Sequence, residues 1–195
     1  ATSAQSNNTV NLNFTNSVPT DIALSTSSIN ENVTTGTTVG GLTTTDVDSG
    51  DTFTYTLVAG DDSTDNNSFS ISGANLLTNT ALDYETKSSY SIRIQTSDGT
   101  ATYAKAFTIN IANVNDAPTD IILSSNSINE NVATSTSVGI LSSTDDDSGD
   151  TFTYTLISGT GATDNTSFSI SSANLLTATT LDFETKSSYS IRVQT

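Results

Sequence analysis

The sequence has no cysteine, histidine, tryptophan or methionine. These absences exclude a disulfide framework, a thiolate nucleophile, a zinc site of the usual Cys/His kind and a Ser-His-Asp triad. Hydrophobic residues make up only 33% of the chain, and no apolar run approaches the roughly 18 residues that a membrane-spanning helix needs. We therefore expect neither an enzyme nor a chain that inserts directly into a membrane.

Basic residues are also scarce, because five Lys and Arg stand against 21 Asp and Glu, for a net charge of −16. Such a charge repels nucleic acid and attracts cations. The short polar residues Thr, Ser and Asn fill close to half of the chain. They compete with helical hydrogen bonding but suit strands and turns. Since the few apolar residues alternate regularly, the composition predicts a folded all-β chain.

A tandem repeat organises the chain. Residues 19–96 align without a gap with residues 118–195, at an offset of 118 − 19 = 99, and 57 of the 78 aligned positions are identical. Residues 1–18 align weakly with 100–117, where the segment Thr9–Leu12 falls on Thr108–Ile111. We expect residues 1–18 to be the tail (last strand) of a preceding repeat, 19–117 a complete repeat, and 118–195 a second repeat that lacks its last strand. The chain would then be a piece of a longer array.

Strand signals follow one another within the complete repeat at the spacing of a sandwich. Phe53, Tyr55 and Leu57 alternate with threonine, which is the period of a half-buried strand. Seven such segments are predicted, at residues 21–24, 38–44, 53–57, 69–71, 76–77, 90–94 and 107–111. This pattern is typical of an immunoglobulin-like β-sandwich.

The acidic residues are concentrated at repeated positions. The four Glu are two positions repeated, Glu31 with Glu130 in Asn-Glu-Asn and Glu85 with Glu184 in Asp-x-Glu. A second cluster follows the same offset: Asp46, Asp48 and Asp51 return as Asp145, Asp147 and Asp150. Clustered carboxylates without lysine partners are costly unless a cation neutralises them. Oxygen-only ligands favour Ca²⁺ ahead of Mg²⁺. The alternatives are a solvated acidic surface and a turn whose Asp side chains cap their own backbone.

The repeats resemble cadherin domains, particularly the cadherin-like tandem repeats of large bacterial surface adhesins. The resemblance is carried by Asn-Glu-Asn at 30–32, Leu-Asp-Tyr-Glu at 82–85, Asp98-Gly99, the junction at 113–121 and the Asp-x-Asp-x-Gly of 145–149. It implies Greek-key sandwiches of about seven strands arranged as a rod, with calcium ions at each junction between repeats. The complete junction would use Glu31, Asp83, Glu85, Asn113, Asn115, Asp116, Asp145 and Asp147. Half-sites would comprise Asp46, Asp48, Asp51 and Asp98 in the first repeat and Glu130, Asp182 and Glu184 in the second.

The resemblance therefore implies a calcium-rigidified extracellular spacer or adhesion module of a cell-surface protein. A calcium-dependent polysaccharide-binding module is the alternative, although the chain has no Trp, the usual sugar-stacking residue. Expected partners are the neighbouring repeats and another copy of the chain. That copy would bind through homophilic adhesion or through donation of residues 1–18 as a strand to the second repeat, which would close its exposed edges.

Overall fold

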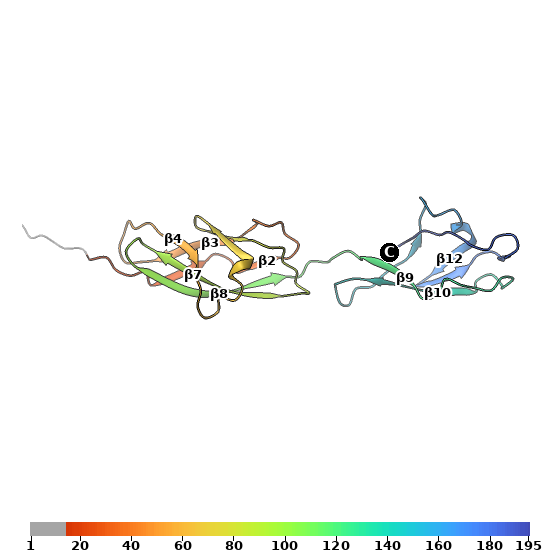
Figure 1. Cartoon of the computed structure of the whole chain (residues 1–195), viewed down its shortest axis with the longest axis horizontal. Helices are drawn as coiled ribbons and strands as arrows, with labels where there is room; N and C mark the ends of the chain where they lie inside the picture. Colours follow the sequence, from red (N-terminus) through yellow and green to blue (C-terminus); the bar gives the residue numbers. More distant parts are fainter. Residues whose placement is uncertain (1–14) are drawn as a thin grey trace, which may run out of the picture. The chain divides into compact units, whose positions relative to one another are not determined.

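The computed structural model describes residues 15–195, and the predicted strand within residues 1–14 lies outside them. The chain divides into two compact units, residues 1–114 and 115–195 (Figure 1). The described part contains 14 strands and two three-residue 3-10 turns, Asn66–Ser68 and Asn165–Ser167. None of its helical segments is long and apolar enough to cross a membrane. The predicted all-β class is confirmed.

The first unit is built from two four-stranded sheets. One has the order β1-β3-β6-β5 and is antiparallel throughout, with β1 at Asp21–Leu24, β3 at Thr38–Thr45, β6 at Asn75–Thr78 and β5 at Phe69–Ser72. The other has the order β2-β8-β7-β4, with β2 at Ser28–Asn30, β8 at Thr102–Ala112, β7 at Ser89–Ser97 and β4 at Thr54–Leu57. In this sheet β2 runs parallel to β8 and the other pairs are antiparallel.

The core of the first unit lies between these sheets. The alternating residues Ile92 and Ile94 of β7 are 0% exposed, as is Ile109 of β8. Phe69 of one sheet meets Tyr90 of the other edge to face, with ring centroids 5.7 Å apart, which is a favourable aromatic geometry. The period-two pattern read from the sequence therefore identified the inward face correctly.

All seven predicted strands of this unit form, and one further strand, β2, was not predicted. Three residues with a single apolar side chain, Ile29, give no local strand signal. The strand exists because Ser28–Asn30 pairs in parallel with residues 110–112 of β8, some 80 residues further along the chain.

The second unit repeats one sheet and only part of the other. Its first sheet has the order β12-β13-β10-β9, with β12 at Phe168–Ser171, β13 at Asn174–Thr177, β10 at Ser137–Thr144 and β9 at Asp120–Leu123. Its second sheet is the pair β11 (Thr155–Leu156) and β14 (Val193–Gln194). Residues 127–129 and 188–192, the counterparts of β2 and of most of β7, form no strand.

Strand pairing places the acidic motifs at opposite ends of the first unit. Ser97 at the end of β7 pairs with Thr102 at the start of β8, and Ser89 pairs with Asn110 near the other end of the hairpin. Asp46 and Asp98 directly follow β3 and β7, so they belong to the first of these ends. Glu31 directly follows β2, at the end where β8 finishes. We call these the Asp end and the Glu end.

Candidate metal centre

The Asp end of the first unit gathers three carboxylates. Asp46, Asp51 and Asp98 each place one oxygen within 4.8 Å of the others. Asp51 is brought back toward Asp46 by a turn in which Gly50 has a φ of 106°, a left-handed conformation that favours glycine. The six-residue segment Asp46–Asp51 thus brings two carboxylates to one point, and the β7–β8 turn brings the third.

One carboxylate oxygen of Asp46 accepts a hydrogen bond from the loop backbone, and the other has no hydrogen-bond partner among residues 15–195. Oδ1 accepts the backbone N–H of Asp48 at 2.9 Å, which is the capping alternative considered from the sequence. Oδ2 is buried and unpartnered within residues 15–195, as is Oδ2 of Asp51. Burial raises the pKa of Asp51, and repulsion from Asp48, Asp46 and Asp98 raises it further. Capping therefore does not account for the whole cluster.

Asp98 is held in its charged form. Its Oδ1 accepts the backbone N–H groups of Thr100 and Ala101, both at 2.7 Å, and Asn16 Nδ2 donates to its Oδ2 at 3.1 Å. These hydrogen bonds lower the pKa of Asp98. The group therefore combines a firmly ionised carboxylate with two that present unsatisfied oxygens.

The second unit has a related group, Asp145, Asp147 and Asp150, whose oxygens also lie within 4.8 Å of one another, but its third member is the counterpart of Asp48 and not of Asp98. Asp145 Oδ1 accepts the N–H of Asp147 at 3.0 Å, while its Oδ2 is buried without a partner in the described part of the chain. The intervening Asp146 is exposed and corresponds to Val47 in the first repeat. Both repeats therefore leave the same oxygen unsatisfied, and the side chain at position 146 takes no part.

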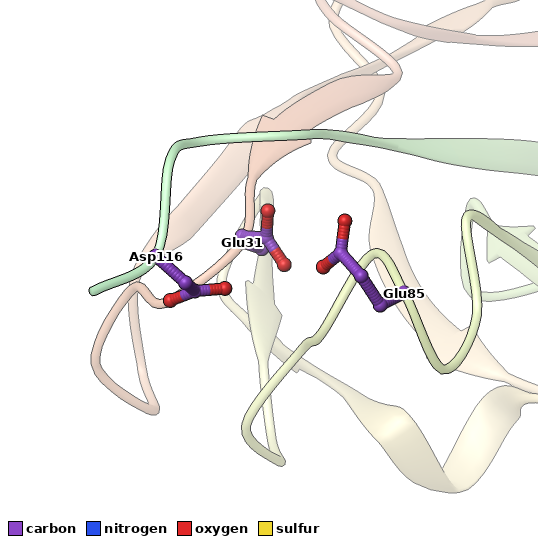
Figure 2. A group of neighbouring side chains, drawn as sticks. All are labelled: Glu31, Glu85 and Asp116. Carbon is purple, nitrogen blue, oxygen red and sulfur yellow. The ribbon is translucent and has the colours of Figure 1, made fainter. Parts of the chain in front are cut away.

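The Glu end carries a different group. Glu31 and Glu85 turn their carboxylates toward each other, and Asp116 of the connecting segment lies within the same 4.8 Å limit (Figure 2). Glu31 is only 2% exposed, yet its two oxygens accept backbone N–H groups from Tyr84 at 2.6 Å and from Val114 at 2.8 Å. Asn113 Nδ2 donates to Glu85 Oε1 at 2.7 Å. Buried Glu31 thus fixes both neighbouring segments.

The corresponding group of the second unit consists of Glu130, Asp182 and Glu184. Glu130 accepts the N–H of Phe183 at 2.9 Å, as Glu31 accepts that of Tyr84. The Thr185 hydroxyl donates to Asp182 at 2.7 Å and, with the Thr185 N–H, lowers the pKa of that carboxyl.

Three predicted ligands have other principal contacts. Asp83 accepts the N–H of Thr86 at 3.0 Å and its hydroxyl at 2.7 Å, and it lies outside the four groups. Asp48 Oδ2 accepts the N–H of Ser17 at 2.6 Å, as Asp147 Oδ2 accepts that of Asp116 at 2.5 Å. Asn115 Nδ2 donates to the Asp116 carbonyl at 2.5 Å.

Asp51 and Asp150 both stand in the acidic clusters found in the sequence, and Asp51 was expected in the half-site of the first repeat, but Asp150 was not among the ligands expected at the complete junction. Both residues end an Asp-Ser-Gly-Asp turn that is identical in the two repeats. Each lies within a carboxylate group of the structure.

The lysines in the described part of the chain pair with acids outside these groups. The three ion pairs found among residues 15–195 join Lys87 to Asp65, Lys105 to Asp21 and Lys186 to Asp164. None of these acids belongs to a group. Carboxylate oxygens gathered at one point are the ligands that a hard cation such as Ca²⁺ prefers.

Comparison with known proteins supports the fold. Residues 25–112 match the Cadherin domain family. Human protocadherin-24 EC1-2 is 19% identical with a TM-score of 0.64, over 92% of this chain and 86% of that one. Mouse cadherin-23 EC22-24 is 24% identical with a TM-score of 0.54, over 83% and 53%. This chain spans only 29% of the protocadherin GammaB4 extracellular domain. Among the curated proteins none matches. The fold is a cadherin-like β-sandwich.

Proposed function

We propose that this chain is a calcium-binding, calcium-stabilised extracellular repeat pair that acts as a spacer or adhesion module of a cell-surface protein. One observation carries the proposal. Asp46 and its counterpart Asp145 each bury an Oδ2 atom that has no hydrogen-bond partner among residues 15–195. A buried anionic oxygen without a donor is costly, and a bound cation removes that cost. The same oxygen is left open in both repeats.

The donor set favours calcium. Each group is made of carboxylates, and the chain has no Cys or His that could offer sulfur or nitrogen ligands. Ca²⁺ accepts six to eight oxygens in flexible geometry, whereas Mg²⁺ demands near-ideal octahedral geometry and gives up water reluctantly. In the first unit the ligands would be Asp46, Asp51 and Asp98 at the Asp end and Glu31 and Glu85 at the Glu end. The bound ion would neutralise their mutual repulsion.

The sequence resemblance adds the junction. We propose that ions are shared between the Glu group of one repeat and the Asp group of the next, through linker residues Asn113, Asn115 and Asp116. Two hydrogen bonds support a role for this linker, because Glu31 accepts from Val114 and Asp147 accepts from Asp116. A bound cation would neutralise the carboxylates, and the linker would become stiffer. Without the cation, repulsion between the carboxylates would leave the linker flexible.

The wider context is proposed on the resemblance alone. The chain would belong to a large bacterial surface adhesin, with the neighbouring repeats as its first partners and a second copy as a homophilic one. Polysaccharide binding stays a prediction from the sequence, since no observation on the described residues favours it.

A thermal melt of the 195-residue chain in millimolar Ca²⁺, in millimolar Mg²⁺ and in excess chelator tests the proposal. A ligand that binds only the folded state raises the free energy of unfolding, by about 2.7 kcal/mol when its concentration is a hundred times its dissociation constant. The melting temperature rises with it. We expect a clear rise in Ca²⁺ and a smaller one in Mg²⁺. Identical curves in Ca²⁺ and chelator would remove the calcium function and leave the fold intact.

A further inference from the structure

Three hydroxyl groups join the two sheets of the first unit. Thr44 Oγ1 of β3 lies 2.7 Å from Thr96 Oγ1 of β7 and donates to the Tyr55 hydroxyl of β4 at 2.9 Å. β3 belongs to one sheet, whereas β4 and β7 belong to the other. Tyr55 and Thr96 pair with each other across β4 and β7, so both hydroxyls reach Thr44 from the same sheet. We call these three side chains the hydroxyl clasp.

The clasp lies directly inside the carboxylates of the Asp end. Thr44 stands two residues before Asp46, and Thr96 stands two residues before Asp98. Since side chains alternate between the faces of a strand, residues two apart belong to the same face. In β7 the inward series that leads out of the core is therefore Ile94, Thr96 and Asp98, which is an apolar side chain, a buried hydroxyl and a carboxylate. The clasp thus separates the apolar core from the acidic group.

A hydrogen bond between two threonine hydroxyls requires their backbones to lie close together. A threonine Oγ1 is about 2.4 Å from its own Cα, so an Oγ1–Oγ1 distance of 2.7 Å allows a Cα separation of at most about 7.5 Å between Thr44 and Thr96. Packed sheets are ordinarily about 10 Å apart. The clasp therefore holds β3 and β7 closer than ordinary sheet packing does, at the point where both strands are about to end.

The carboxylates beyond the clasp push these two strand ends apart. Asp46 and Asp51 follow β3 and Asp98 follows β7, and their oxygens gather within 4.8 Å of one another. Like charges at this distance repel. Hydrogen bonds between the sheets at this end oppose the repulsion, and the clasp supplies two of them.

The second repeat keeps the clasp although one of its residues differs. Ser143, the counterpart of Thr44, lies 3.0 Å from the Tyr154 hydroxyl and donates to Thr195 Oγ1 at 2.9 Å. The change from threonine to serine removes a methyl group and retains the hydroxyl. Asp145 again follows two residues later. The two repeats therefore share the hydroxyl contacts and not the methyl packing.

We propose that Thr44, Tyr55 and Thr96 are positioning residues for the cation site at the Asp end. The clasp holds the two strand ends at a fixed separation, so that Asp46 and Asp98 stay within reach of one ion. Because the carboxylates are brought together during folding, the cost of their approach is not subtracted from the binding free energy. The inference rests on the proposed calcium binding, and it gives hydroxyls that do not contact the ion a role in its affinity.

Calorimetric calcium titration of the full chain carrying Thr96→Val tests the assignment. Valine keeps the shape of threonine and removes the hydroxyl. Loss of a group that orients metal ligands typically weakens metal affinity by about tenfold to a hundredfold, and we expect a loss at the lower end of this range. Thr96→Ser keeps the hydroxyl and should bind calcium like the wild type. Ile92→Val, an equally buried site on β7 outside the clasp, should lower stability and leave the affinity unchanged.

A double-mutant cycle with Asp46→Asn locates the effect. Because the clasp acts through the Asp group, Thr96→Val should weaken calcium binding in the wild-type background and have no further effect in the Asp46→Asn background. Calcium binding by the wild type with unchanged affinity in Thr96→Val, or with equal losses in both backgrounds, overturns the inference and leaves the proposed function in place. Absence of calcium binding by the wild type overturns both.

Amide hydrogen exchange in excess chelator tests the clasp without a metal. Carboxylates of the Asp group accept the backbone N–H groups of Asp48, Thr100 and Ala101. Tyr55→Phe removes one hydroxyl of the clasp and keeps the ring in place. The strand ends should then separate more often, and these three amides should exchange about threefold faster or more, while the amides of β6 keep the wild-type rate. Unchanged exchange at all three amides, or an equal increase in β6, overturns the inference.

Discussion

Glu31 Oε1 accepts the backbone N–H of Val114 at 2.8 Å, across 83 residues of sequence. The same carboxylate accepts the N–H of Tyr84 through its other oxygen. One buried side chain therefore joins the start of the repeat to its Asp-x-Glu loop and to the segment that follows β8. A carboxylate has about four lone-pair sites, so these two bonds leave oxygen lone pairs for a cation.

Replacing Glu31 with Gln should destabilise the first unit. A glutamine amide keeps the shape, but its nitrogen cannot accept, so either Tyr84 or Val114 loses its acceptor. The expected loss is about 1–3 kcal/mol in chemical denaturation followed by circular dichroism. Glu130→Gln is the matched control and should cost less, because Glu130 is more exposed and accepts one backbone N–H in the structure, that of Phe183. Equal losses for both variants would contradict this role of Val114.

Substitution of Gly50 should weaken calcium binding at the Asp end, whereas substitution of Gly36 should not. Both have positive φ, 106° and 88°, and neither would bring a Cβ near another atom. Gly50→Ala should therefore cost about 1–2 kcal/mol from backbone strain and also displace Asp51, weakening calcium binding. Gly36→Ser copies Ser135, which holds a φ of 66° in the second repeat, and should leave calcium binding unchanged. Calorimetric titration of both variants separates strain from ligand placement.

Asp65 should make the first unit sensitive to acid. Burial raises its pKa, but the Lys87 ammonium and the Ser91 N–H outweigh burial and hold the pKa below the ordinary 3.8. A lowered folded-state pKa adds stability that is present above pH 3.8 and lost as the pH falls through the folded value.

Asp65→Asn should therefore cost about 1 kcal/mol at neutral pH, with a deficit that shrinks as the wild type is acidified. Urea midpoints measured from neutral pH down to below the ordinary pKa check this. A constant deficit at every pH would mean that packing, and not charge, is responsible.

Thr78 shows how a polar residue is tolerated in the core. It is 1% exposed, and its hydroxyl donates to the Thr34 carbonyl and accepts the Thr37 N–H. Thr177 repeats both contacts with residues 133 and 136. Thr78→Val should cost about 1–3 kcal/mol because the partners lose their hydrogen bonds, whereas Thr78→Ser should cost less. Denaturation midpoints compare the two, and a more stable valine variant would contradict this assignment.

Local pattern was sufficient for most of the fold. Alternation along residues 53–57 and 90–94 gave the strands and their inward faces, because strand periodicity is a local property. Strand β2 was not predicted, because it forms only through parallel pairing with a strand that is distant in the sequence. Among the acids, the repeat marked most of the positions that gather into carboxylate groups in the structure. Asp83 and Asp182 occupy the same motif and accept equivalent hydrogen bonds from Thr86 and Thr185, yet only Asp182 lies within a group, and the motif does not predict this difference.

The central claim is that buried, unpartnered oxygens of Asp46 and Asp145 are calcium ligands. Calorimetric calcium titration of the full chain carrying both Asp46→Asn and Asp145→Asn tests it most directly, with the exposed Asp146→Asn as the charge-matched control for the second site. The account predicts calcium binding by the wild type and by the control, and affinity at least about tenfold weaker in the double variant. Identical isotherms for the double variant and the wild type, or no binding by the wild type, would contradict it.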